Sequence, residues 1–130
     1  MRKRPPSRPT EAELSILRVI WSKGPSTVRE VHEELLRDQD DLGYTTVLKL
    51  MQIMAEKDLL TRDESSRAHI YAARNPEQIT QQQLIGHLVD RAFGGSASQL
   101  VLQALSNRGS SPRELEQIRR LIDELEGARK

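Results

Sequence analysis

Two threonines, a lysine and a glutamine can hydrogen-bond nucleic acid if residues 43–57 form one helix. Thr45, Lys49 and Gln52 then lie on one row, and Thr46 lies beside the N-terminal end of that row. Hydroxyl, ammonium and amide groups are the ones that bind phosphates and base edges in the major groove of DNA. The row is also compatible with an ordinary exposed helix face, so the neighbouring elements must decide between the two interpretations.

The opposite side of the same helix is apolar. Its residues recur at helical spacing and are Val47, Leu50, Met51 and Met54. A stripe of this kind is expected to pack against a hydrophobic core. Gly43 stands at the position of the N-cap.

Two further helices are predicted before this one. Thr10 and Glu13 have the spacing of a capping box that starts the first helix, and Gly24-Pro25 ends it. Ser26 is expected to cap the second helix, and the polar residues 38–43 form the turn that follows. Three helices joined by short turns indicate a helix-turn-helix arrangement.

A β-hairpin is predicted directly after the third helix. Residues 59–64 and 68–72 alternate in polarity on either side of a serine-rich turn. A hairpin in this place is the wing of a winged helix. Arg62 and Arg67 are placed on or near it and are expected to contact the DNA backbone, whereas His69 is expected to be an exposed strand residue.

Residues 75–127 are predicted to form three short helices that carry aliphatic surface. The first begins at 75–78, the second covers 99–105 and the third is capped at Ser111. Helices this short cannot bury so much apolar surface among themselves, so we expect a second copy of the chain to cover it. The predicted dimer contacts are Leu84, Leu88, Leu100, Leu115, Ile118, Ile122 and Leu125.

Composition excludes several classes of function. The 130-residue chain has no cysteine, so it has no disulfide, thiolate metal site or cysteine nucleophile. Its three histidines lack partners at ligand or triad spacing, and no glycine-rich loop follows a strand. We therefore expect no enzyme activity, catalytic residue, metal, cofactor or small-molecule substrate. No apolar run approaches ~18 residues, so a cytoplasmic protein is expected.

The sequence thus predicts a mainly α fold with a small β-hairpin wing. It divides into a basic arm at 1–9, a winged helix-turn-helix DNA-binding domain at 10–74 and a helical dimerisation domain at 75–130. The predicted DNA contacts are Tyr44, Thr45, Thr46, Lys49, Arg62 and Arg67. A net charge of +1 gives no general attraction for DNA, so the alternative of a winged-helix protein–protein interaction module stays open.

Several motifs resemble the penicillinase-repressor family, the winged-helix repressors of BlaI/MecI type. The matching stretches are 9–14, 19–21, 44–48, 56–59 and 88–95. The most specific is Tyr44-Thr45-Thr46-Val47-Leu48, and the resemblance covers residues 9–126.

The resemblance implies a dimer that silences a promoter until a membrane sensor protease triggers its cleavage. It aligns the cleaved bond with Gln103–Ala104. Better-known members of the family have Asn-Phe at that bond, so this chain departs from the family pattern there.

Overall fold

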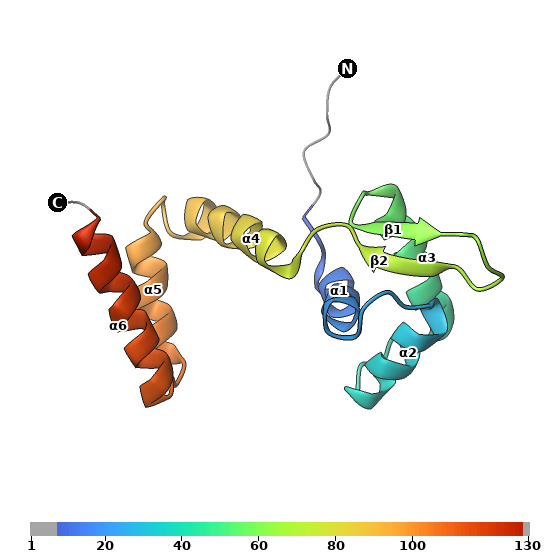
Figure 1. The fold of residues 1–130 in the computed structure, drawn as a ribbon, viewed down its shortest axis with the longest axis horizontal. Coiled ribbons are helices and arrows are strands. Elements are labelled where there is room, and N and C mark those ends of the chain that lie inside the picture. Colours follow the sequence, from blue (N-terminus) through green and yellow to red (C-terminus); the bar gives the residue numbers. More distant parts are fainter. Residues whose placement is uncertain (1–7, 129–130) are drawn as a thin grey trace, which may run out of the picture. The chain divides into compact units, whose positions relative to one another are not determined.

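The computed structural model describes residues 8–128 (Figure 1), so the predicted basic arm at 1–9 lies outside them except for its last two residues. The elements in chain order are α1 (Glu11–Lys23), α2 (Val28–Arg37), α3 (Tyr44–Glu56), β1 (Leu60–Asp63), β2 (Ile70–Ala73), α4 (Glu77–Ala92), α5 (Ala97–Asn107) and α6 (Pro112–Gly127). The chain divides into two compact units, and the division falls between Ile85 and Gly86, inside α4.

The first unit has the predicted winged helix-turn-helix arrangement. Helices α1, α2 and α3 are followed directly by an antiparallel hairpin, in which Leu60 pairs with Ala73 and Asp63 with Ile70. Figure 1 shows the hairpin extending from the end of α3. The predicted fold class, mainly α with a small β wing, is confirmed.

One hydrophobic core holds the three helices and the hairpin together. Val47, Met51 and Met54 of α3 are completely buried in it, and Leu50 packs at its edge. The other buried members come from α1, α2, the link after α3 and the hairpin, and are Ile16, Leu17, Val19, Ile20, Val28, Val31, Leu35, Leu59, Leu60 and Tyr71. Because α3 buries one side, its opposite side must face outward.

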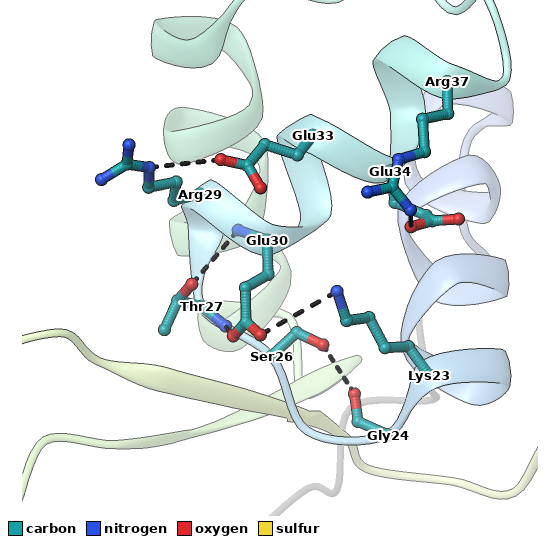
Figure 2. Close-up of polar contacts among 9 residues, drawn as sticks. All are labelled: Lys23, Gly24, Ser26, Thr27, Arg29, Glu30, Glu33, Glu34 and Arg37. Atoms are coloured by element: carbon teal, nitrogen blue, oxygen red, sulfur yellow. Dashed lines mark hydrogen bonds and ion pairs between the residues drawn. The ribbon is translucent and has the colours of Figure 1, made fainter.

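The start of α2 corrects the prediction that Ser26 caps this helix. The N-cap is Thr27, whose hydroxyl accepts from the Glu30 amide at 3.2 Å while Glu30 accepts from the Thr27 amide at 2.9 Å (Figure 2). These hydrogen bonds lower the pKa of Glu30. Ser26 is buried instead: its backbone pairs with Tyr71, and its hydroxyl donates to the Gly24 carbonyl at 2.8 Å.

The three helices after the hairpin differ little from the predicted ones. Helix α4 begins at Glu77, one residue after the predicted Pro76. Gly94 and Gly95 adopt left-handed φ angles of 56° and 86° and separate α4 from α5. Ser96 caps α5, which is longer than the predicted 99–105. None of the helices in residues 8–128 is long and apolar enough to cross a membrane.

Helix α6 starts at the predicted cap. The Ser111 hydroxyl and the Glu114 carboxylate form a capping box, with Pro112 in the first turn. No residue of α5 or α6 is buried. The apolar faces of these helices are therefore not covered by the described part of a single chain.

A buried ion pair ties the start of α1 to the end of α3. Glu13 is 2% exposed, and the Lys57 ammonium lies 2.9 and 3.0 Å from its two carboxylate oxygens. Glu13 also accepts from the Thr10 amide at 2.8 Å, so one carboxylate serves both the cap and the ion pair. Lys57 is the C-cap of α3, and the pair therefore fixes that end of the helix.

Lys57→Met should destabilise the first unit by about 2 kcal/mol, because Glu13 would remain buried without its cation. The measurement is the midpoint of urea unfolding followed by circular dichroism. Arg29→Met is the matched control, since it breaks an exposed pair with Glu33 (3.3 Å) that contributes little. Equal midpoints for the two variants would contradict the importance of the buried pair.

Candidate nucleic-acid interface

The exposed side of α3 carries the residues predicted to read DNA. Tyr44 is 47% exposed, and Thr45, Thr46, Lys49 and Gln52 are all exposed or partly exposed. Thr45, Lys49 and Gln52 form one row, because residues three and four apart share a side of a helix, and Tyr44 and Thr46 lie on either flank of that row. The structure therefore leaves all of the predicted groove residues accessible, and their contact with DNA stays a prediction.

The N-terminus of α3 has no side-chain cap. Its N-cap, Gly43, has no polar side chain, and no side-chain hydrogen bond caps this helix, whereas Thr10, Thr27, Ser96 and Ser111 cap α1, α2, α5 and α6. The first amides of a helix need acceptors and carry the positive end of its dipole. An external anion such as a DNA phosphate can supply them.

Charge pairing differs between α2 and α3. Figure 2 shows ion pairs on the exposed side of α2, where Arg29 binds Glu33 and Arg37 binds Glu34 at 3.3 Å each. By contrast, Lys49 of α3 takes part in no ion pair among the described residues. Of these two helices, α3 is thus the one that presents an uncompensated cation.

The wing carries one paired and one exposed arginine. The Arg62 guanidinium lies 2.8 Å from the Glu64 carboxylate. A side-chain hydrogen bond with Tyr71 raises the pKa of Arg62, and the negative charge of Glu64 raises it further by a smaller amount. Arg67 is exposed in the turn. The sequence carries a signal for this pair, because Glu64 stands two residues after Arg62 and residues two apart in an extended chain share a face.

The turn of the wing is shaped by a local hydrogen bond. The Asp63 carboxylate accepts from the Ser65 amide at 2.9 Å, and this bond lowers the pKa of Asp63. His69 is exposed, as predicted, but it lies just before β2 and not within the strand.

An aromatic contact joins α2 to the beginning of α3. The ring centroids of His32 and Tyr44 lie 5.7 Å apart, and their planes are at 84°, an edge-to-face arrangement. The sequence does not predict this contact, because no local pattern relates a residue of one helix to a residue of the next. His32 is partly buried.

No group of three metal-binding side chains occurs among residues 8–128. The remaining features, an exposed polar row on the third helix, an uncapped helix start and a wing with arginines, define a winged helix-turn-helix protein of the DNA-binding class.

Residues 9–124 match the family model described as penicillinase repressor, and this chain belongs to the penicillinase repressor family. This confirms the resemblance in the sequence motifs. The relatives below are named as transcriptional regulators and not as enzymes, in agreement with the prediction from composition.

Among the relatives is the transcriptional regulator BlaI of Mycobacterium tuberculosis, 30% identical over 118 residues that cover 89% of this chain and 83% of that protein. The penicillinase repressor of Staphylococcus aureus is 20% identical over 114 residues, which cover 88% and 90% of the two chains. A solution structure of monomeric Bacillus licheniformis BlaI in complex with the blaP half-operator matches with 22% identity and a TM-score of 0.49, covering 57% of this chain and 89% of that one.

Proposed function

We propose that this protein is a dimeric transcriptional repressor that binds a pseudo-palindromic DNA operator. The observation that carries the proposal is the exposed side of α3, where hydroxyls and an unpaired lysine surround an uncapped helix start. Membership of the penicillinase repressor family supports the same function. In this proposal, residues 10–74 bind DNA and residues 75–130 hold the dimer together.

The proposed groove contacts combine base reading and backbone binding. Thr45, Thr46 and Lys49 enter the major groove, because the N-terminal part of a recognition helix is the part that reaches base edges. Arg62 and Arg67 bind the flanking phosphates. The exposed Arg62–Glu64 pair is worth little in water, so a phosphate can replace Glu64 at small cost.

The proposed dimer covers apolar side chains that a single chain leaves in water. Leu88, Ile122 and Leu125 are 46%, 48% and 59% exposed. Burying such side chains is favourable by roughly 25 cal/mol per Å² of apolar area. The proposed contacts are Leu84, Leu88, Leu100, Leu115, Ile118, Ile122 and Leu125.

We further propose that proteolysis within α5 ends repression, with a membrane sensor protease as the partner. Gln103 and Ala104 are both exposed and lie well inside α5, so a cut between them would separate α6 from the rest of the chain. The separated helix includes Leu115, Ile118 and Ile122. Each winged helix would then hold its half-site alone.

A winged-helix module that binds another protein is the competing function. An interface of that kind is expected to be apolar at its centre. The outward row of α3 is instead polar and carries a cation, which favours DNA.

The double substitution Thr46→Ala and Lys49→Ala should weaken operator binding by about 1–3 kcal/mol for each hydrogen-bonded base that it leaves without its protein partner. If Lys49 binds a phosphate, the slope of log affinity against log salt should fall by about 1. Binding is measured by fluorescence anisotropy at several salt concentrations. Arg120→Ala, on the side of α6 away from the proposed dimer contacts, is the control for loss of a positive charge. Unchanged affinity in the double variant would exclude α3 as the reading helix.

Ile118→Asp and Ile122→Asp together should produce monomers in sedimentation experiments, because two buried carboxylates would oppose the dimer. Circular dichroism should show that the first unit stays folded. Arg120→Asp is the matched control: it also changes the net charge by −2 but lies on the other side of α6. A double variant that stays dimeric would place the interface elsewhere.

A chain truncated after Gln103 should bind a half-site like the intact protein but lose roughly 10²–10⁴ in affinity for the full operator, because the two DNA-binding units are no longer linked. Both affinities are measured by gel shift. Full-operator binding equal to that of the intact chain would refute cleavage as the release mechanism.

A further inference from the structure

We propose that His32 is a positioning residue: it holds Tyr44 against α2, so that the Tyr44 hydroxyl binds a DNA phosphate instead of a base edge. The inference rests on the proposed function of α3 as the groove-reading helix. It assigns Tyr44 a role different from that of Thr45 and Lys49.

The angular positions on α3 separate Tyr44 from the polar row. Successive residues of a helix are rotated by about 100°. Thr45, Lys49 and Gln52 therefore share one row, and Tyr44 lies about 100° away from its centre, between that row and the buried stripe. The contact with His32 shows that this flank of α3 faces α2.

The contact leaves the functional end of Tyr44 available. The two rings meet edge to face with centroids 5.7 Å apart, an attractive arrangement because the positive edge of one ring meets the negative face of the other. Tyr44 is nevertheless 47% exposed, and its hydroxyl has no hydrogen-bond partner among the described residues. The ring is held while the hydroxyl remains free to donate.

The way in which a helix-turn-helix docks on DNA indicates which part of the DNA this flank of α3 would contact. The helix before the recognition helix crosses the phosphate backbone while the recognition helix enters the groove. A side chain held on the α2 side of α3 is therefore directed toward that backbone. Tyrosine hydroxyls are common phosphate donors, and such contacts add affinity without reading sequence.

The first test separates phosphate binding from base reading. Tyr44→Phe keeps the ring and loses only the hydroxyl, so the affinities for the operator and for a scrambled duplex of equal length should fall by the same factor, roughly 3- to 10-fold. Thr45→Val is the matched control, because it removes a hydroxyl from the polar row. Its loss should be larger on the operator than on the scrambled duplex.

The second test asks whether His32 acts through Tyr44. His32→Ala should lower operator affinity roughly 2- to 10-fold, in line with the strength of an aromatic pair. His32→Phe should restore it, because a ring remains at that position. In a Tyr44→Phe background, His32→Ala should have no further effect on binding. Thermal unfolding of each variant shows whether the fold is retained.

Two results would overturn the inference. A Tyr44→Phe loss confined to the operator would mean that Tyr44 reads a base, and an equal His32→Ala loss in both backgrounds would mean that His32 acts independently. Failure of the proposed function looks different: Thr45→Val and Lys49→Ala would then leave operator binding unchanged. A protein that binds neither duplex would refute both.

Discussion

The burial of one side of α3 is the constraint on which the interface depends. Val47, Met51 and Met54 are completely enclosed by the core, so the rotation of this helix about its axis is set by packing. A shift of one residue would turn the helix by about 100° and bury either the Thr46 hydroxyl or the Gln52 amide, depending on its direction. The Glu13–Lys57 pair adds a fixed point at the C-terminal end of α3. The polar row is thus presented by the same contacts that stabilise the fold.

Local placement of charge explains how a chain with a net charge of +1 can attract DNA. The exposed arginines of α2 are compensated by neighbouring glutamates, which leaves that surface close to neutral. On α3 the lysine is uncompensated, and the uncapped helix start adds the positive end of a dipole. Of these two helices, the one that attracts phosphate is thus the one that also carries the proposed base contacts.

Features encoded within a few residues of one another could be predicted from the sequence. The capping boxes at Thr10 and Ser111 and the apolar stripe of α3 are of this kind. The predicted cap of α2 was wrong because Ser26 and Thr27 can both cap a helix, and a bridge from Ser26 to β2 decides between them. The Glu13–Lys57 and His32–Tyr44 contacts could not be predicted, since they join different helices and leave no local pattern.

The helices of the second unit differ in what stabilises them. Helix α6 has a capping box, a proline in its first turn and Arg120 four residues after Glu116, all of which favour a helix without burial. Helix α5 has 11 residues, one side-chain cap and no buried residue, and isolated helices shorter than ~12–15 residues are marginal in water. Under the proposed dimer, a second copy would supply the missing burial for α5. Helix content in α5 and association of the chains would then be coupled, and the segment that contains Gln103–Ala104 would be the part of the chain most sensitive to dissociation.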